Sequence, residues 1–445
     1  MSDEPSGSDS GAGVSRELAV AGGTLEFDCI VVGAGIAGLA AARALINAGK
    51  RVAVLEARPR TGGRLHSIRA EGCDLPIELG AEFIHGKPPE LLDLVSEAGK
   101  SCFELDGRAL RTENGRLQDG DFGEAFSVLR GLPEEPDQSF KHWMQGQHYP
   151  SATAAAATSY VEGFNAADAA IIGIRGLVVQ QRAEDAIDGN RVFRVEQGYS
   201  SLAEYLAQQF TAAGGTLYLS SPVRRIEWSR GSVRVESGTR GQLPRKSHAP
   251  RCIVTLPLGV LQRGDVLFDP VPRRSLDAAA QLAMGSAVRI VMVFRERFWN
   301  ADYANLRFLF LEGAMPSVWW TSAPNASPTL TGWVGGPRAH DPAIATSGGL
   351  LRKGIDGLAR AFRVAPEAIV KRLLTWHTHN WQTDTYSQGA YSYVPKGAFD
   401  AMRSLAEPVE DTLFFAGEHT DFTGHWGTVH GALHSGLRAA GQVKS

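Results

Sequence analysis

The chain has 445 residues, more than one ordinary hydrophobic core holds, so we expect two domains. Its 43% of hydrophobic and 21% of charged residues are typical of a globular protein and exclude a fibrous or wholly disordered chain. A net charge of -3 offers no basic field to a polyanion, so nucleic acid is excluded as a partner.

The N-terminal segment MSDEPSGSDSGAGVSREL is acidic and rich in serine and glycine, and it predicts a disordered tail over residues 1–25. No apolar run approaches the roughly 18 residues that a membrane-spanning helix needs, so we expect a cytoplasmic protein with no membrane partner. The cysteines are scattered without a C-x-x-C pair, which favours reduced, mostly buried thiols over a disulfide framework or a thiolate metal site.

The first organised element is FDCIVVGAGIAGLAAARALINAGKRVAVLEA, residues 27–57, which predicts a buried strand, a glycine turn, a helix and a second strand. Gly33, Gly35 and Gly38 form G-x-G-x-x-G at the strand-to-helix junction, where backbone N–H groups and the helix dipole meet a pyrophosphate. Glu56 ends the second strand, at the position from which an acid grips a ribose hydroxyl pair. We therefore predict a dinucleotide site.

The middle of the chain predicts an inserted domain. Residues 102–158 are irregular and charged, and the next predicted helices are SYVEGFNAADAAIIGIRGL (159–177) and SSLAEYLAQQF (200–210). Strands with turn residues between them follow in GGTLYLSSPVRRIEWSRGSVRVES (214–237), and CIVTLP (252–257) predicts a buried strand. That buried strand returns the chain to the nucleotide-binding domain.

The C-terminal half predicts a second, mostly β unit with helices. RFLFLE, SVWWTS and TLTGWVGG predict strands within residues 307–336, and PEAIVKRLLTW (366–376) predicts a helix. LFFAGEHT (413–420) is one more buried strand, which leads into a final helix.

Six motifs stand in order along the chain: G-x-G-x-x-G, E-A-R, R-x-G-G-R in RPRTGGR, E-L-G-A, P-V-x-x-I and F-A-G-E. In this order they resemble the flavin-dependent amine oxidases, and the resemblance covers nearly the whole chain after residue 25. The stretches ELGAEFIHG and GEHTDFTGHWGTVHGALHSGLRAA are most similar to those of polyamine oxidases, with the lysine-specific histone demethylases as near relatives and the monoamine oxidases further away.

The resemblance implies an α/β fold, in which a Rossmann-like FAD-binding domain of the G-x-G-x-x-G type carries a second, α+β substrate domain built from inserted segments. The ranges expected for the FAD-binding domain are 26–100, 191–270 and 405–445, and those for the substrate-binding domain are 101–190 and 271–404. Monoamine oxidases attach their flavin to a cysteine, whereas Ala390 precedes Tyr391 here, so we expect non-covalent FAD.

The resemblance also implies contacts to the cofactor. Arg64 is expected to pair with the pyrophosphate, and Gly80 to let the backbone lie close to the isoalloxazine ring. Val223 is expected to hold the adenine through its backbone, and Glu418 to meet the ribityl and phosphate region. The expected cofactor-binding residues are Gly33, Gly35, Ala37, Gly38, Glu56, Ala57, Arg58, Gly63, Arg64, Gly80, Ala81, Val223, Trp381, Gly417, Glu418 and Val429.

His430 and His434 lie four residues apart, the spacing with which a helix presents two zinc ligands. Gly431 stands where a zinc-protease helix carries its glutamate, and no third ligand is suggested nearby. We therefore predict no metal, and expect both histidines to pack or hydrogen-bond on a helix that begins near Thr428. The resemblance directs the N-terminus of that helix at the N1–C2=O edge of the flavin, where negative charge collects on reduction.

By the same resemblance, Tyr391 forms one wall of an aromatic cage that steers the amine, unless it is simply a core tyrosine. Thr428 replaces the second tyrosine of the monoamine oxidases, which widens the pocket. His85, in I-H-G, is placed to hydrogen-bond the amine or a water, although Phe83 replaces the tryptophan of animal polyamine oxidases. Trp381 is expected beside the flavin, with a core position as the alternative.

Arg289 in MGSAVRIVMVF occupies the position at which the family usually has a lysine that holds a water against flavin N5 and assists reaction with oxygen. A guanidinium is planar and does not exchange protons near neutral pH, so water placement and oxygen reactivity are expected to differ. The alternative is that Arg289 turns away from the flavin.

These residues predict an FAD-dependent amine oxidase. Its expected substrate is a polyamine or another primary or secondary amine, which is oxidised to an imine that hydrolyses to an aldehyde while O2 is reduced to H2O2. An L-amino-acid oxidase is an alternative that shares the FAD motifs but needs an arginine to clamp the substrate carboxylate. A non-catalytic flavin-binding regulatory protein is a second alternative, suggested by Arg289 in place of lysine.

Overall fold

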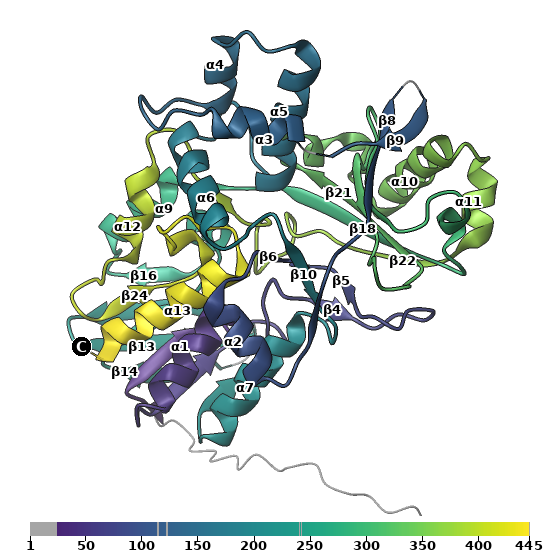
Figure 1. Cartoon of the computed structure of the whole chain (residues 1–445). Helices are drawn as coiled ribbons and strands as arrows, with labels where there is room; N and C mark the ends of the chain where they lie inside the picture. Colours follow the sequence, from purple (N-terminus) through teal and green to yellow (C-terminus); the bar gives the residue numbers. More distant parts are fainter. Residues whose placement is uncertain (1–24, 114, 122, 240, 242, 445) are drawn as a thin grey trace, which may run out of the picture.

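The computed structural model describes residues 25–113, 115–121, 123–239, 241 and 243–444. The tail predicted for residues 1–25 lies outside the described residues except at Leu25, where strand β1 begins. A parallel sheet and a larger mixed sheet lie in different parts of the molecule, and helices surround both (Figure 1).

The parallel sheet has the strand order β11 (Thr216–Tyr218), β3 (Val52–Leu55), β2 (Cys29–Val32), β15 (Cys252–Val254) and β24 (Leu413–Phe415). Strand β2, helix α1 (Ile36–Ile46) and strand β3 form the predicted βαβ unit. Strands β2, β3, β15 and β24 are buried throughout, as expected of a parallel sheet that is covered on both faces. The Rossmann-like α/β fold is thus confirmed.

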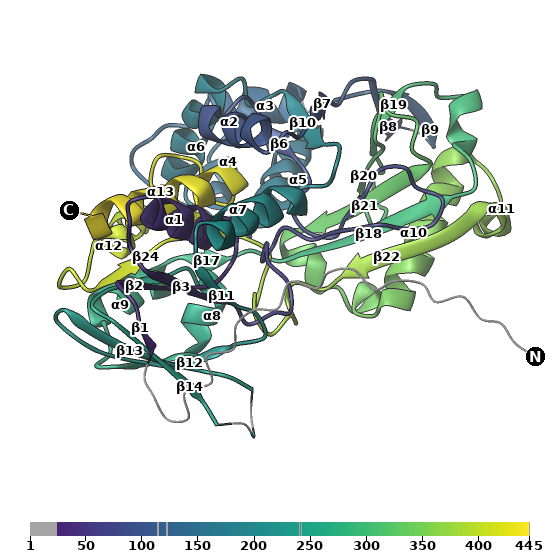
Figure 2. The same ribbon diagram turned by 90° about the horizontal axis from the view of Figure 1, so that it is seen from below.

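Helices pack on one face of this sheet, and a second sheet packs on the other (Figure 2). Helices α1, α7 (Ser200–Ala212) and α13 (Val429–Lys444) cover one face, with α2 (Pro89–Glu97) beside them. The other face packs against a second sheet, which has the order β1 (Leu25–Glu26), β14 (Arg245–Ala249), β13 (Ser232–Ser237), β12 (Val223–Ser229) and β16 (Leu267–Asp269). Three helices complete that core, α8 (Leu258–Arg263), α9 (Arg273–Gln281) and α12 (Phe399–Ala406).

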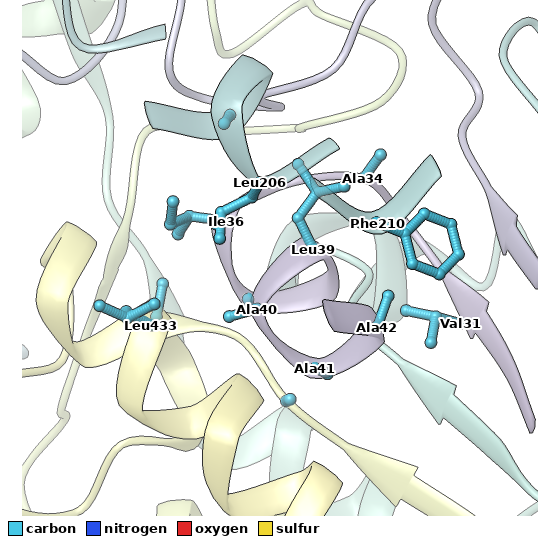
Figure 3. Packing of buried hydrophobic residues seen from close by; sticks show 14 of the residues in the cluster. Val31, Ala34, Ile36, Leu39, Ala40, Ala41, Ala42, Leu206, Phe210 and Leu433 are labelled. Carbon is cyan, nitrogen blue, oxygen red and sulfur yellow. The ribbon is translucent and has the colours of Figure 1, made fainter. Parts of the chain in front are cut away.

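Helix α1 is held tightly between α7 and α13 (Figure 3). A Cβ at Gly436 of α13 would lie 2.1 Å from the carbonyl oxygen of Ala37, so α13 approaches α1 this closely only because Gly436 has no side chain. Leu206 and Phe210 of α7 pack against the same alanine-rich helix. This contact fixes α13 relative to the glycine turn at the start of α1.

The mixed sheet has seven strands in the order β22 (Leu373–His379), β18 (Ala287–Phe294), β21 (Thr329–Gly335), β20 (Val318–Trp320), β19 (Leu306–Phe310), β8 (Arg108–Glu113) and β9 (Arg116–Asp119). Neighbouring strands are antiparallel except β19 and β8. Helices α10 (Ser347–Phe362) and α11 (Pro366–Arg372) pack beside it (Figure 1). Its strands come from both ranges expected for the substrate domain, although the domain limits themselves stay a prediction.

The helix predicted for residues 366–376 is wrong in its last part. Helix α11 ends at Arg372, and Leu373–His379 form β22 because LLTWHTH pairs antiparallel with β18. The interpretation of residues 102–158 as irregular is also wrong, since they contain β7 (Cys102–Glu104), β8, β9, α3 (Gly123–Arg130), α4 (Phe140–Gln145) and the first half of α5 (Ser151–Asn165).

The helix predicted over residues 159–177 is interrupted. Helix α5 ends at Asn165, Ala166 adopts a φ of 51°, and α6 (Ile174–Ala186) begins only at Ile174. Between them, Ile172 forms a bridge to Pro395 and Gly173 one to Ser139, so contacts with distant segments replace helical hydrogen bonds.

Several short strands connect the larger sheets: β4 (Ser67–Ile68) with β5 (Ile77–Glu78), β17 (Ala283–Met284) with β23 (Ser392–Tyr393), and β10 (Val192–Val195) between β6 (Ile84–His85) and β7. Of the helices in the described ranges, none combines the length and the apolar character that a membrane span requires.

Candidate active site

A cavity of about 1880 Å³ extends from the carboxyl ends of β2, β3 and β15 to the mixed sheet and helices α5 and α6. Pockets for drug-sized ligands measure roughly 300–1,000 Å³, so this cavity has room for a dinucleotide and a second molecule. Every residue predicted to bind the cofactor or the substrate lines it except Gly38. A Cβ at Gly38 would lie 2.0 Å from the carbonyl oxygen of Gly33, so Gly38 serves the packing of the turn.

The glycine turn opens into this cavity. Gly33 has a φ of 104°, which glycine adopts readily and other residues rarely do. Gly35 is the N-cap of α1, no side chain caps the helix there, and a Cβ at Gly35 would meet no atom within 4 Å. The uncapped first turn of α1 therefore lies at open space, as the binding of a pyrophosphate requires.

Glu56 follows β3 and lines the same end of the cavity. Its Oε2 accepts a hydrogen bond from the Ala34 N–H at 2.7 Å, and its Oε1 accepts one from the Arg58 N–H at 2.8 Å. Burial raises the pKa of Glu56, and these two hydrogen bonds oppose the rise. Each oxygen keeps lone-pair capacity for a ribose hydroxyl, so the turn and Glu56 together fit a dinucleotide.

The structure pairs Arg64 with Glu418, two residues that were expected to contact different parts of the cofactor. Arg64 Nη1 donates to Glu418 Oε1 at 2.7 Å and to the Ala390 carbonyl at 2.9 Å. Burial alone would raise the pKa of Glu418, but the charge of Arg64 and the hydrogen bonds from Arg64 and Ser392 outweigh it, so the pKa is lowered. The guanidinium thus has a protein partner, and its contact with the pyrophosphate stays a prediction.

Gly80 makes a close backbone contact within the protein, and its predicted approach to the flavin stays a prediction. A Cβ at Gly80 would lie 1.9 Å from the carbonyl oxygen of Arg64. The missing side chain therefore allows two backbone segments to touch.

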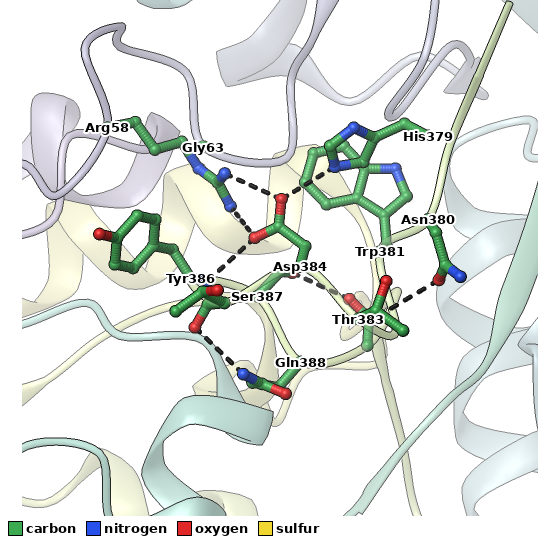
Figure 4. A network of polar contacts seen from close by, with 12 residues as sticks. Arg58, Gly63, His379, Asn380, Trp381, Thr383, Asp384, Tyr386, Ser387 and Gln388 are labelled. Atoms are coloured by element: carbon green, nitrogen blue, oxygen red, sulfur yellow. Dashed lines mark hydrogen bonds and ion pairs between the residues drawn. The ribbon is translucent and has the colours of Figure 1, made fainter.

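Figure 4 shows how Arg58 is held. Asp384 accepts two hydrogen bonds from its guanidinium, at 2.6 and 2.9 Å, and lies 2.9 Å from His379 Nε2. Burial would raise the pKa of Asp384, but the hydrogen bonds with His379 and Arg58 hold it well below its ordinary value. Trp381 packs on His379 with ring centroids 4.2 Å apart and donates Nε1–H to the Leu79 carbonyl, so it is both a packed residue and a wall of the cavity.

Tyr391 and His85 meet at Phe164, a residue that belongs to no motif in the sequence. The Tyr391 hydroxyl donates to the Phe164 carbonyl at 2.6 Å, and the His85 ring meets the Phe164 ring edge to face with centroids 5.3 Å apart. Burial lowers the pKa of His85 to about 4, so its ring is neutral near pH 7. These residues form an aromatic part of the cavity wall with a protonated hydroxyl and an uncharged imidazole.

Helix α13 begins at Val429, one residue after the predicted start. The Thr428 hydroxyl accepts a hydrogen bond from the Gly431 N–H at 3.0 Å and donates one to the His425 carbonyl at 2.6 Å. Thr428 therefore caps the helix as well as lining the cavity, and it fixes the N-terminus of α13 at the cavity wall.

His430 and His434 both pack edge to face on the His425 ring, with centroids 4.6 and 6.2 Å away. His430 Nε2 lies 3.1 Å from His425 Nδ1, and His434 Nε2 lies 2.8 Å from Glu90. Both therefore pack on the helix as expected, His430 with a hydrogen bond to His425 and His434 with an ion-pair contact to Glu90. Within the described ranges, no three histidine, cysteine, aspartate or glutamate side chains converge as metal ligands.

Arg289 is buried in the middle of β18 and lines the cavity. One terminal nitrogen donates to the Gly80 carbonyl and the other pairs with Glu82, while Nε is buried without a partner in the described structure. Arg194 approaches the second oxygen of Glu82 at 3.1 Å, and Trp320 lies 5.6 Å from the Arg289 guanidinium. The sequence offered only one signal for Glu82 and Arg194, an isolated charge in each of two apolar segments.

Comparisons with known proteins show a family resemblance over most of the chain. The profile of the family described as "Flavin containing amine oxidoreductase" matches residues 36–145 and 134–444. Polyamine oxidase 4 of Oryza sativa subsp. japonica is 29% identical, with 95% of this chain and 90% of that protein covered. The rice lysine-specific histone demethylase 1 homolog 2 is 28% identical over 94% of this chain, but only 57% of that longer protein is covered.

Two solved structures show the same fold. Wild-type putrescine oxidase bound to putrescine superposes with a TM-score of 0.80 at 22% identity, covering 95% of this chain and 100% of that chain. Cyclohexylamine oxidase from Brevibacterium oxydans IH-35A gives a TM-score of 0.79 at 22% identity, with 94% and 98% covered.

Proposed function

This chain belongs to the family of flavin-containing amine oxidoreductases and is an FAD-dependent amine oxidase, and we propose that it oxidises a polyamine or another primary or secondary amine with O2 as electron acceptor. The observation that carries the proposal is one continuous cavity. Its glycine turn fits the cofactor, and its other end is walled by Tyr391, His85 and Phe164. The likeness to a polyamine oxidase over most of both chains supports the polyamine class.

FAD, which the glycine turn at Gly33 and Gly35 and the carboxylate of Glu56 would hold, would supply the two-electron oxidant for the amine α-C–H bond, with O2 as the final acceptor that becomes H2O2. The amine is thereby oxidised to an imine. Water then converts the imine to an aldehyde and releases the amine nitrogen. The protein orients the amine and excludes water. The Tyr391 ring is held by its hydroxyl on Phe164, and neutral His85 accepts or donates a hydrogen bond without repelling a positive substrate.

Ala390 has no group that could form a thioether to the flavin, which supports non-covalent FAD. A cytoplasmic location also stays a prediction. Arg289 is a poor candidate for the carboxylate clamp that an L-amino-acid oxidase needs, because its charge is already paired with Glu82 and its other terminal nitrogen donates to the Gly80 carbonyl.

The test is anaerobic bleaching of the holoenzyme flavin by a panel of polyamines, diamines, monoamines and amino acids, followed by product mass spectrometry. We expect an amine to bleach the flavin and air to restore it over repeated cycles. Bleaching by amino acids faster than by their decarboxylated amines would instead establish an amino-acid oxidase, and no bleaching by any of these compounds would establish a protein without this turnover.

A further inference from the structure

The histidines of α13 belong to a row of imidazoles that runs from the cavity wall to the surface. His430 is buried and lines the cavity, and its Nε2 lies 3.1 Å from His425 Nδ1. The His425 ring also packs edge to face on His434, which is one turn further along α13 and 28% exposed. His434 Nε2 lies 2.8 Å from a carboxylate oxygen of Glu90, which is 49% exposed. Exposure to solvent therefore rises along the row from His430 to Glu90.

The backbone holds His425 in the middle of this row. Its N–H donates to Asp421 Oδ1 at 3.1 Å, and its carbonyl accepts from the Thr428 hydroxyl at 2.6 Å. A Cβ at Gly431 would lie 2.0 Å from the same carbonyl oxygen, so this loop lies so close to α13 only because residue 431 is a glycine. The loop and the helix thus fix the His425 ring against the two histidines of α13.

The inner imidazoles of the row are neutral. Burial lowers the pKa of His425 and of His430, so neither ring keeps a proton near pH 7. The titratable groups that face these two rings are Asp421, Glu90, His434 and, at the cavity wall, His85. The two acids oppose the fall in pKa, and the two imidazoles add to it. A neutral imidazole has one N–H and one lone pair, so it accepts a proton on one nitrogen and releases one from the other.

The outer end of the row carries a negative charge. The contact with His434 lowers the pKa of Glu90, so this carboxylate is ionised near pH 7. It is also solvated, and water removes a proton that reaches it. The row therefore has a neutral inner end in the cavity wall and a proton acceptor at the surface.

Amine oxidation requires a proton to leave the cavity. An alkylamine resembles the lysine side chain, whose ordinary pKa is about 10.4, so the substrate enters as an ammonium ion near pH 7. Loss of hydride from the α-carbon needs the nitrogen lone pair, because that pair forms the C=N bond of the imine. One N–H bond of the ammonium must therefore break first, with its electron pair left on nitrogen and its proton passed to another group.

Resting on the proposed function, we propose that His430, His425 and His434 form a relay that carries this proton from the substrate ammonium to Glu90 and the solvent. His430 accepts the proton at the cavity wall and passes its Nε2 proton to His425 Nδ1. The centroids of the His425 and His434 rings are 6.2 Å apart, and one water molecule completes the path between them. Each ring accepts one proton and releases one, so the relay keeps its charge over a turnover.

The experiment compares His425→Ala with the parent holoenzyme in anaerobic flavin bleaching by the best amine of the panel. At pH 7 we expect the variant to bleach about 10-fold or more slowly. The two rates should converge as the pH approaches about 10, because the substrate then arrives as the neutral amine. Added imidazole, which fits the space of the missing ring, should restore most of the rate at pH 7. An equal loss at every pH, a loss that imidazole does not restore, or no loss would overturn the relay.

His248→Ala is the matched control. The His248 ring is also half-buried and hydrogen-bonded, to Ser232 at 3.1 Å, but it belongs to β14 and does not line the cavity. This variant should bleach at the parent rate and should not respond to imidazole. An imidazole response in His248→Ala as large as in His425→Ala would show that the rescue is not specific, and would count against the relay.

A second measurement separates the relay from the proposed function. In weakly buffered solution, a pH-indicator dye follows the proton that is released when an amine binds to the oxidised enzyme, before any turnover. We expect His425→Ala to slow this release about 10-fold. If no amine reduces the flavin but the release is still slowed, the proposed function fails and the relay stands. If the parent and the variant release the proton at the same rate, the relay is overturned even where the flavin is reduced.

His434→Gln guards against a folding defect, because this half-buried side chain lies at the outer end of the row and its loss leaves His430 and His425 in place. It should slow proton release about 3-fold or more at pH 7, with the same convergence toward high pH. Release at the parent rate in His434→Gln contradicts an exit at Glu90.

Discussion

Glu82 binds Arg289 on one carboxylate oxygen and Arg194 on the other, and all three side chains are buried. Two cations surround Glu82, and the nearby acid Glu78 has a pKa that burial raises to about 7, so the cluster is net positive while Glu78 is protonated. Glu82 also fixes the planar Arg289 guanidinium against the Gly80 carbonyl. Arg289 therefore does not turn away from the cavity, and it stands there as part of a rigid cluster where the family usually has a flexible lysine.

Arg289→Met should slow the reoxidation of reduced flavin by O2. The substitution leaves a neutral Arg194–Glu82 pair, so the positive charge that favours negative charge developing on oxygen is lost. We expect a decrease of about 10-fold or more, equivalent to at least ~1.4 kcal/mol of barrier, with a smaller effect on anaerobic reduction by amine. Stopped-flow measurement of both half-reactions checks this.

Arg289→Lys is the matched control for that experiment, and it should retain or raise the oxygen reactivity because it restores the usual family residue. Should Arg289→Met reoxidise at the parent rate, the arginine is structural. Oxygen activation would then belong to other groups, such as His85 or the N-terminus of α13.

Glu82→Gln should destabilise the fold strongly, because it leaves two buried guanidinium groups without their carboxylate. Breaking a buried ion pair typically costs about 3–5 kcal/mol. We expect the free energy of unfolding, measured with urea, to fall by about 3 kcal/mol, the lower end of this range. Glu227→Gln is a matched control, since Glu227 also lies between two arginines, Arg225 at 2.8 Å and Arg234 at 3.7 Å, but on the surface. It should cost less than about 1 kcal/mol. Similar losses in both variants would show that burial of the cluster does not matter.

Gly35→Val should fold but fail to hold FAD. The backbone of Gly35 has a φ of -73°, which valine accepts, and a Cβ there meets no protein atom within 4 Å. The added methyl groups would occupy the space at the N-terminus of α1 that the pyrophosphate needs. Absorbance of the purified protein measures its FAD content, and circular dichroism checks the fold. Gly441→Val, at an equally open position on α13, should keep its flavin; normal flavin content in Gly35→Val would place the pyrophosphate elsewhere.

The stability of the protein should fall between about pH 6.5 and pH 4, in part because of His419. This ring is buried, neither nitrogen has a hydrogen-bond partner in the described structure, and burial lowers its pKa to about 4. His419 binds a proton more tightly in the unfolded chain than in the folded protein. The stability that comes from keeping this ring neutral is therefore fully present above pH 6.5 and is lost as the pH falls toward 4.

His419→Gln should therefore reduce the drop in unfolding free energy between pH 7 and pH 5 by an amount on the order of 1–2 kcal/mol. Denaturant unfolding at several pH values measures the drop. His148→Gln, at an exposed position, should leave it unchanged. An identical pH dependence in His419→Gln and the parent would mean that His419 does not titrate in this range.

The sequence by itself determined the cofactor half of the protein, because that half depends on local patterns. The spacing of Gly33, Gly35 and Gly38 and the acid at Glu56 lie within one βαβ unit, where neighbours in sequence are neighbours in space. The order of the motifs along the rest of the chain then indicated the family, and the family implied FAD. Prediction from the local pattern was wrong where pairing with a distant strand outweighed helix propensity. Leu373–His379 were predicted in part as a continuation of helix α11, but they pair with β18 as a strand.

Only the tertiary structure decided which side chains share the substrate end of the cavity. Glu82 and Arg194 are far apart in sequence and meet because β6 and β10 pair in one short sheet. Phe164 and Glu184 belong to helices separated by a non-helical segment that the sequence did not reveal. They reach the same cavity as Tyr391 because α5 packs against β21 of the mixed sheet and α6 packs in one helical core with α5. A buried charge is stable or costly according to the partners that the fold brings to it, and no spacing along the chain contains that information.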